Sequence, residues 1–425
     1  MSTVVVIGAG LAGLASASRL AEAGIDVTLV TKGLGGLQLS QGTIDILGYS
    51  PQRVTNPLAA IAPGGPLVPD STAATGLIHP YAMIGAERVK AGVEYLAELL
   101  GESMLVGDPT RNFQLPTALG GVRPTALAAP SMAAGDVKAG DKWVIAGLRR
   151  LKDFHARLVA GNLARTTLPD GGSLQVRAVS LDLPAVKGEV DSNAVIYARA
   201  CDDQGFRVRL AGELKPLLKR GEKVGLPAML GLRDPLAWHD LSQKLGTQVF
   251  EIPLGPPSVP GLRLNDALLA HLRRLGVRLV NGNRAIGYRA EGDAVTGIEV
   301  ATAGAPRVYR CDAVVYAPGG LESGAIAMDA DGELSEALFG LPLARPDGEL
   351  LHGRFWGAEQ PVFRVGVAVD SSMRVLGPDS APVWANLRAA GGLLGGANRI
   401  AEKSGEGIAL GSAVAAADAI IEELS

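Results

Sequence analysis

The sequence predicts an α/β protein built on a split dinucleotide-binding domain of the Rossmann type, with an inserted α/β cap domain. Three observations support this prediction. The chain opens with a short apolar strand, a glycine turn and a helix. A second glycine-rich loop leads into a long apolar helix near the other end, and a proline-rich stretch between them marks the return from an insertion. We expect residues 1–109 and 258–425 to form the dinucleotide-binding domain and residues 110–257 to form the cap.

The first glycine turn is the strongest local signal. Thr3 to Ile7 is a β-branched run typical of a buried parallel strand, Leu14 to Ala23 has a helical pattern, and Asp26 to Val30 is the next strand. The residues between the first strand and the helix fit the GxGxxG motif of a FAD/NAD(P)-binding fold; they are Gly8, Ala9, Gly10, Leu11, Ala12 and Gly13. In this motif the first glycine makes the turn, the second lets a pyrophosphate approach, and the third lets the helix pack closely.

The end of the second strand departs from the usual NAD pattern. An acidic residue normally binds the ribose there, but this chain has Thr31 and Lys32. Ribose binding would then use Thr31 or backbone groups, which weakens the case for NAD. The following glycine-rich loop carries Ser40, Gly42 and Thr43, and we interpret it as the wall of the cofactor site; the alternative is an ordinary polar loop.

Composition excludes several classes of function. The chain has 40 Lys and Arg residues and 43 Asp and Glu residues, so its formal net charge is 40 − 43 = −3. No block of like charge stands out, so nothing indicates nucleic-acid binding. The two cysteines, Cys201 and Cys311, lie far apart and cannot hold a metal or an iron–sulfur cluster alone, so we expect no metal site. No run reaches the about 18 apolar residues that span a bilayer, so we expect a soluble chain.

The middle of the chain gives weaker patterns. Residues 53–77 read as an exposed connector, and residues 120–141 as irregular. Helical patterns cover residues 80–100 and 143–162, and a strand pattern covers residues 174–184. The four prolines between residues 249 and 264 argue against helix and central strand.

The last part of the chain completes the predicted sheet. A helix at residues 263–275, a strand at 277–280, a hairpin around Gly292 and a strand at 312–320 follow in order, and the last of these ends in glycines that include Gly319. We expect a further strand at 363–369. Gly391 and Gly392 then open a loop that feeds a helix at 407–423, which is anion-binding geometry; the alternative is a plain strand-to-helix turn.

These residues resemble known flavoproteins. Two glycine loops with a cap between them, and the pair Thr31-Lys32, are similar to the flavoprotein family of fumarate reductase and succinate dehydrogenase. More closely, the chain resembles the family of B subunits of anaerobic glycerol-3-phosphate dehydrogenase. The matching stretches are Val30-Thr-Lys-Gly33, Ser40-Gln-Gly-Thr-Ile-Asp-Ile-Leu47, His79-Pro-Tyr-Ala-Met-Ile-Gly85, Pro256-Pro-Ser-Val-Pro-Gly-Leu-Arg-Leu264 and the loop from Gly391 to Gly396.

The resemblance implies oxidation of sn-glycerol 3-phosphate to dihydroxyacetone phosphate, with electrons passed to the quinone pool. It implies two partners, a larger flavoprotein subunit and an iron–sulfur subunit that anchors the complex, so the chain would be cytoplasmic and attached peripherally to the cytoplasmic membrane. The family is often credited with FMN. This sequence favours FAD, with FMN as the alternative, because the GxGxxG turn binds a pyrophosphate and FMN has none.

Oxidation of a secondary alcohol needs a base, a hydride acceptor and cations for the phosphate. The candidate cations are Arg399, Arg263 and Arg354, and the candidate base is His352. The resemblance to fumarate reductase would place Arg399 over the flavin; the alternative for Arg399 is an ion pair with Glu402 or Glu406.

One departure from the fumarate reductase pattern bears on catalysis. No His stands in the predicted strand that matches its substrate-binding His, which argues against dicarboxylate chemistry and against catalysis by this chain alone. Two other functions therefore stay open. One is a flavin-binding assembly or electron-transfer subunit without turnover, and the other is a stand-alone flavin dehydrogenase.

Overall fold

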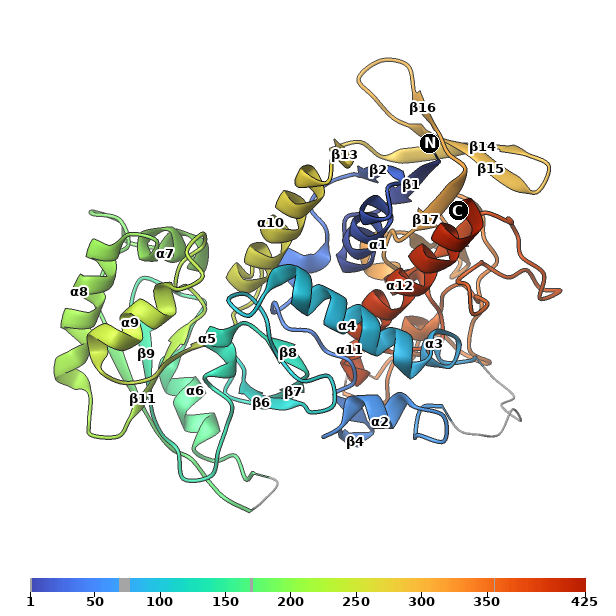
Figure 1. The fold of residues 1–425 in the computed structure, drawn as a ribbon. Coiled ribbons are helices and arrows are strands. Elements are labelled where there is room, and N and C mark those ends of the chain that lie inside the picture. Colours follow the sequence, from blue (N-terminus) through green and yellow to red (C-terminus); the bar gives the residue numbers. More distant parts are fainter. Residues whose placement is uncertain (1, 69–76, 169–170, 355) are drawn as a thin grey trace. The chain divides into compact units, whose positions relative to one another are not determined.

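A computed structural model describes residues 2–68, 77–168, 171–354 and 356–425. The described chain forms two compact units (Figure 1). The first contains residues 1–36, 45–96 and 268–425, and the second contains residues 37–44 and 97–267. The predicted insertion of residues 110–257 falls within the second unit. The predicted domain limits themselves stay a prediction.

The first unit is built on a parallel sheet. Its order within the described residues is β13-β2-β1-β17-β20. These strands are β1 (Thr3–Ile7), β2 (Asp26–Thr31), β13 (Arg278–Asn281), β17 (Ala313–Tyr316) and β20 (Leu387–Ala389). The central strand β1 lies between β2 and β17, so the order in space reverses there. Ligands of open parallel sheets bind outside the carboxyl ends of the strands at such a point.

Two helices cover one face of this sheet. Helix α1 (Leu11–Glu22) and helix α12 (Gly405–Leu424) pack side by side, blue and red in Figure 1. The packing is close because α12 is rich in Gly and Ala, which bring backbones together. Asp418 near the end of α12 forms a bidentate ion pair with Arg19 of α1.

The rest of the first unit surrounds this core. An antiparallel sheet contains β14 (Ala285–Glu291), β15 (Ala294–Val300) and β16 (Arg307–Arg310). The smaller helices are α2 (Pro57–Ile61), α3 (Pro80–Ile84) and α11 (Arg399–Glu402), with 3₁₀ turns at Leu321–Ser323, Pro361–Arg364 and Gly391–Leu393. Helix α4 (Ala86–Leu100) and the 3₁₀ turn at Gly36–Leu39 begin in this unit and end in the second. Short hairpins pair β3 (Tyr49–Ser50) with β4 (Gln52–Arg53) and β18 (Ile326–Met328) with β19 (Leu334–Glu336).

The second unit has its own parallel sheet, in the order β10-β9-β11-β12. The strands are β9 (Lys142–Leu148), β10 (Gln175–Leu181), β11 (Lys223–Pro227) and β12 (Val249–Ile252). The helices are α5 (Pro130–Ala133), α6 (Ala156–Leu163), α7 (Ala194–Cys201), α8 (Gln204–Leu214) and α9 (Ala237–Leu245). Helix α10 (Val259–Arg274) begins in this unit, and its residues from Leu268 on belong to the first unit. The further elements are β5 (Val106–Gly107), β6 (Phe113–Pro116), β7 (Val122–Thr125), β8 (Leu127–Ala128) and a 3₁₀ turn at Lys215–Leu217. Trp143 and Phe250 are buried in its core, with ring centroids 4.5 Å apart.

The helix expected over residues 143–162 is wrong in its first half. Residues Lys142–Leu148 form strand β9, and only Ala156–Leu163 is helical. The run Trp-Val-Ile-Ala-Gly-Leu is apolar throughout because β9 is buried on both faces, and such a run has no alternation to separate it from a buried helix.

Four smaller expectations also differ. Residues 120–141 contain β7, β8 and α5. Residues 249–252 form β12, and Pro260 lies in the first turn of α10, where the missing N–H costs nothing. The strand expected at 363–369 is a 3₁₀ turn at Pro361–Arg364 followed by isolated bridges. The connector at 53–77 includes α2, and its residues 69–76 lie outside the described residues.

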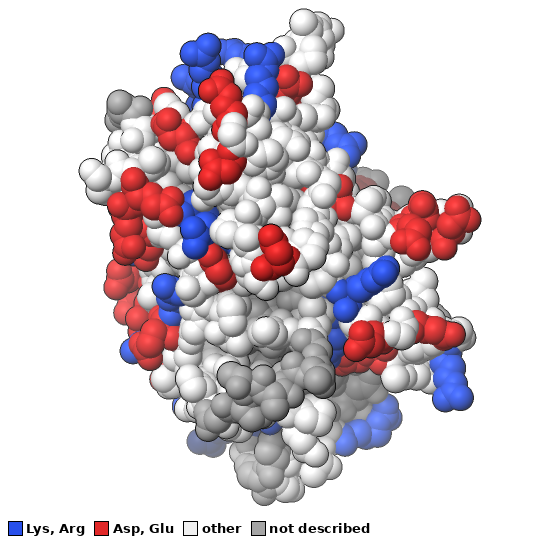
Figure 2. Space-filling view, turned by 90° about the vertical axis from the view of Figure 1, so that its right-hand side faces the viewer, with Lys and Arg blue, Asp and Glu red and all other residues white. Residues whose placement is uncertain are grey.

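Figure 2 shows acidic and basic side chains interspersed on one face of the protein, with uncharged areas between them. In the described part of the chain, no helix is long and apolar enough to cross a membrane.

Candidate cofactor site

The turn between β1 and α1 is held by backbone contacts that only glycine permits. Gly8 has φ of +109°, and its N–H donates to the Val30 oxygen at 2.9 Å. A Cβ at Gly8 would lie 2.1 Å from the Ala317 carbonyl oxygen, and a Cβ at Gly13 would lie 1.9 Å from the Gly8 oxygen. Side chains at these two positions would therefore push apart the strand, the turn and the helix.

Gly10 is different, because a Cβ there meets no described atom within 4 Å. Its backbone is extended, with φ of −77° and ψ of 178°, which any residue can adopt. Gly10 is also the N-cap of α1, and among the described residues no side chain caps this helix. The first N–H groups of α1 are thus left for a ligand, and the open space at Gly10 lets that ligand approach. This cradle fits the pyrophosphate of a dinucleotide.

Two further glycine loops lie beside this turn. Gly319 and Gly320 follow β17, and Gly391 and Gly392 follow β20. A Cβ at Gly391 would be 2.9 Å from the Cβ of Ala12, and a Cβ at Gly320 would be 2.6 Å from the Gly392 oxygen. The structure therefore brings together the three predicted glycine segments at the carboxyl edge of the first unit's sheet.

The end of β2 closes another side of this region. The Thr31 hydroxyl donates to the Gly33 oxygen at 2.6 Å and accepts from the Gly33 N–H at 3.3 Å. The Lys32 ammonium donates to the Ser323 oxygen at 2.6 Å, just after the Gly319-Gly320 pair. Both side chains shape the loops, and their contact with a ribose stays a prediction.

The predicted wall residues Ser40, Gly42 and Thr43 belong to the second unit. Ser40 donates to the Leu37 oxygen at 2.9 Å and accepts from the Gly42 N–H at 3.2 Å, which closes a local turn. Thr43 accepts a hydrogen bond from Arg123 at 3.1 Å. Their assignment to the cofactor stays a prediction.

Among the candidate catalytic residues, Arg399 lies next to the glycine loops. Its Nη2 is 3.3 Å from both carboxylate oxygens of Glu322, so the ion pair that the structure shows is with Glu322. A Cβ at Gly320 would be 3.0 Å from the same nitrogen. Arg399 is thus the candidate cation that the structure places against the glycine loops of the cofactor cradle.

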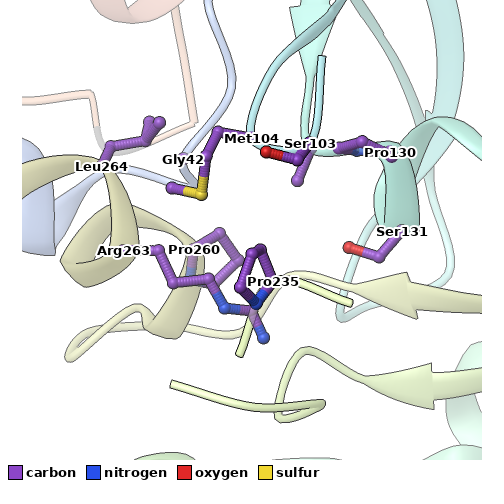
Figure 3. A pocket seen from close by; sticks show the side chains of 10 residues that line it. Gly42, Ser103, Met104, Pro130, Ser131, Pro235, Pro260, Arg263 and Leu264 are labelled. Carbon is purple, nitrogen blue, oxygen red and sulfur yellow. The ribbon is translucent and has the colours of Figure 1, made fainter. Parts of the chain in front are cut away.

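The other candidates make different contacts. His352 is hydrogen-bonded to Gln360 and to the Glu359 oxygen, and Arg354 is exposed. Arg263 belongs to the second unit and forms a buried ion pair with Glu251, at 2.7 and 3.1 Å. Figure 3 shows Arg263 beside a pocket of about 10 Å³, which has room for no more than a water. The catalytic roles of these three residues stay predictions.

Sequence reasoning missed a buried group behind the Arg399 loop. The Glu402 carboxylate accepts hydrogen bonds from the Asn398 N–H at 3.0 Å, the Ser404 hydroxyl at 3.0 Å and His79 Nε2 at 3.2 Å. His79 Nδ1 accepts from the Tyr81 N–H, so the ring proton of a neutral His79 lies on Nε2 and points to Glu402. Glu402 thus ties both sides of the Arg399 turn to helix α3.

The charge of Glu402 is stabilised despite its burial. Burial alone would raise its pKa, but hydrogen bonds from His79, Ser404 and the Asn398 N–H outweigh this effect and hold the pKa below the ordinary value of 4.5. No local pattern announces this contact, since His79 and Glu402 are 323 residues apart.

The first unit therefore has the geometry of a dinucleotide-binding flavoprotein. A family model described as FAD binding domain matches residues 3–408. A probable B subunit of anaerobic glycerol-3-phosphate dehydrogenase from Halobacterium salinarum is 33% identical over 445 aligned residues, covering 100% of this chain and 98% of its own length. The B subunit of the same enzyme from Pectobacterium carotovorum is 31% identical, with 99% and 98% covered.

The chain therefore belongs to the FAD-binding domain family and, within it, to the family of anaerobic glycerol-3-phosphate dehydrogenase B subunits. The resemblance inferred from the sequence is confirmed. FAD is the cofactor, and the chain is a flavoprotein of the oxidoreductase class. Among solved structures, a 3-ketosteroid Δ1-dehydrogenase from Sterolibacterium denitrificans is 13% identical with a TM-score of 0.45, covering 100% of both chains.

We predict that Gly10→Val folds but loses FAD. The fold has room for the side chain, so the added methyl groups meet the pyrophosphate alone. We expect at least about a tenfold loss of FAD affinity, or about 1.4 kcal/mol. Flavin content of the purified protein and titration of the apoprotein with FAD measure this loss. The matched control is Gly304→Val, at an exposed glycine with open space. A Gly10→Val protein with full FAD occupancy would contradict the assignment.

We also predict that Glu402→Gln lowers the free energy of unfolding at pH 7 by about 1–3 kcal/mol. Both carboxylate oxygens of Glu402 accept from N–H donors, so the NH₂ of the amide would face the N–H of either His79 or Asn398. The folded-state pKa of Glu402 is depressed, so its stabilisation is present above 4.5 and is lost as the pH falls through the folded pKa. Urea unfolding across the acid range should therefore show a smaller pH dependence in the variant. Glu291→Gln, at an exposed carboxylate, is the control. Equal pH dependence in Glu402→Gln and wild type would show that Glu402 has no such role.

Proposed function

We propose that the chain is the FAD-containing B subunit of a quinone-linked glycerol-3-phosphate dehydrogenase. One observation carries this proposal: the likeness to relatives with that name extends over the whole chain at 31–33% identity. The partners would be a larger flavoprotein subunit and an iron–sulfur subunit that attaches the complex to the cytoplasmic membrane. The chain would stay on the cytoplasmic side.

In the proposed reaction, C2 of glycerol 3-phosphate loses a hydride and its hydroxyl loses a proton, which leaves dihydroxyacetone phosphate. FAD supplies the two-electron acceptor when it is bound. The N-terminus of α1 would hold the pyrophosphate, and Arg399 would face an anionic group of the substrate or the flavin. Ile400, which is 53% exposed next to Arg399, offers an apolar surface beside that cation.

Transfer of electrons away from the FAD needs a partner. Within the described residues, no group of three or more Cys, His, Asp or Glu side chains is placed to hold a metal ion. Single electrons pass to a quinone through centres such as iron–sulfur clusters. This consideration supports a complex in which a partner chain supplies the cluster.

A second candidate function is a flavin-binding assembly or electron-transfer subunit without substrate turnover. Two observations favour it. Arg399 is already paired with Glu322, and residues 362–366, which match the substrate-binding strand of fumarate reductase, contain no His. The stand-alone dehydrogenase of the fumarate reductase type is not favoured by any observation.

We predict that the isolated chain oxidises glycerol 3-phosphate slowly or not at all, although it carries FAD. A dye-linked assay should be run on the isolated chain and on the co-purified complex, at equal FAD content. The proposed function expects turnover in the complex only. If the isolated chain reached the rate of the complex, the chain would be catalytically self-sufficient. If the complex showed no activity, glycerol 3-phosphate would be ruled out as the substrate.

We predict that Arg399→Ala in the complex weakens substrate use about ten- to hundredfold, because a charge-assisted contact is worth about 1.5–3 kcal/mol. Arg399→Lys should recover only part of it, since Lys lacks the bidentate fork. The control is Glu322→Gln, which removes the ion-pair partner and keeps the cation. If Glu322→Gln and Arg399→Ala changed KM equally, Arg399 would serve only the ion pair.

A further inference from the structure

The second unit contains a cavity of about 610 Å³, and all the residues that line it belong to that unit. It lies at the carboxyl end of β9, between the first turn of α6 and strand β10. Its lining includes Gly147 and Leu148 at the end of β9, Ser180 near the end of β10, and Ala156 at the start of α6. A volume of this size is ordinary for a small-molecule site.

The topology of the sheet marks the same place. The chain runs from β9 to β10 on one side of β9, and then crosses to β11 on the other side. All three strands are parallel, so the order in space reverses at β9. Open parallel sheets bind ligands outside the carboxyl end of the strand where the order reverses. The cavity is therefore where this fold class places a ligand.

The lining of the cavity is strongly basic. It contains Arg149, Lys152, His155 and Arg157, and no Asp or Glu. Lys152 forms an ion pair with Asp191 at 2.6 Å. Arg149 and Arg157 are exposed and form no ion pair with another described residue, so both guanidinium groups are available to an anion.

The nearby acids do not cancel this charge. Asp182 already binds Arg150, which is not part of the lining, and the Glu189 side chain does not line the cavity. Asp153 lies in the same loop but does not line the cavity. An anion entering the cavity would thus meet two free guanidinium groups and no carboxylate in the lining.

Helix α6 adds donors to the same side. His155 is its N-cap, and its side chain makes no capping hydrogen bond. The N–H groups of the first turn are therefore open to an anion, as in α1 of the first unit. The Ser180 hydroxyl supplies a further donor at the lining.

We propose that this cavity binds a phosphate-bearing small molecule of nucleotide size. The guanidinium groups of Arg149 and Arg157 would contact the phosphate oxygens, and the remaining volume would hold the organic part. This site is independent of the FAD cradle and of the proposed dehydrogenase reaction, since all its residues belong to the second unit. The small pocket at Arg263, shown in Figure 3, does not share these properties. Its cation is neutralised by an ion pair with Glu251 at 2.7 Å.

The test is a calorimetric titration of the full chain, saturated with FAD, with adenosine 5′-diphosphate and separately with pyrophosphate. Saturating FAD keeps the first unit's dinucleotide site closed to the probes. We expect saturable binding of at least one probe that weakens as the salt concentration rises. Arg149→Ser with Arg157→Ser should weaken it about tenfold for each cation, which corresponds to about 1.4 kcal/mol each.

The matched control is Arg199→Ser with Arg220→Ser, which removes two exposed cations of the same unit outside the cavity. This control should change the affinity by less than about twofold, compared with the tenfold loss, about 1.4 kcal/mol, expected for each cation of the lining. FAD content and melting temperature show that each variant is folded. The proposal is wrong if neither probe binds wild type, or if the two double variants change the affinity equally.

Discussion

The structure of the first unit depends on one close backbone contact, between the β1–α1 turn and the end of β17. The Gly8 backbone approaches the Ala317 carbonyl so closely that a Cβ would be 2.1 Å away, and Gly13 approaches Gly8 in the same manner. This contact fixes where α1 begins and how closely it lies on the sheet. The N-terminus of α1 is thereby aimed across the carboxyl edge, next to the loops after β17 and β20.

The same arrangement recurs in the second unit with different side chains. Both units have a parallel sheet whose order reverses at its first long strand, and both have an uncapped helix after that strand. In the first unit the helix follows a glycine turn that admits a pyrophosphate. In the second it follows a loop rich in Arg and Lys. Backbone geometry dominates the first site, and side-chain charge would dominate the second.

Much of the first unit could be predicted from the sequence because its signals are local. The strand, glycine turn and helix at residues 3–22 follow each other directly, and the apolar helix α12 is long enough to be unambiguous. The core strand β9 could not be identified in this way, because an apolar run buried on both faces has no period. Long-range contacts were beyond any local pattern. The pairing of Arg399 with Glu322 and of Glu402 with His79 depends on the folded chain.

The two ion pairs at the Arg399 turn differ in their exposure to water. Glu402 is buried and fully hydrogen-bonded, so it holds the turn in one conformation. Glu322 is half exposed, so its contact with Arg399 is weakened by water and can exchange for another anion at small cost. A turn that is held in place by Glu402, with Arg399 free to exchange its anionic partner, suits recognition of a charged ligand.

We infer that the glycine cradle of the first unit selects a dinucleotide flavin. The most direct measurement is to purify the chain alone, release its flavin by denaturation, and identify and count it by chromatography. We expect FAD at about one molecule per chain, because the uncapped N-terminus of α1 and the open space at Gly10 suit a pyrophosphate, which FMN lacks. FMN in place of FAD, or a folded chain with no flavin that fails to take up FAD, would contradict it.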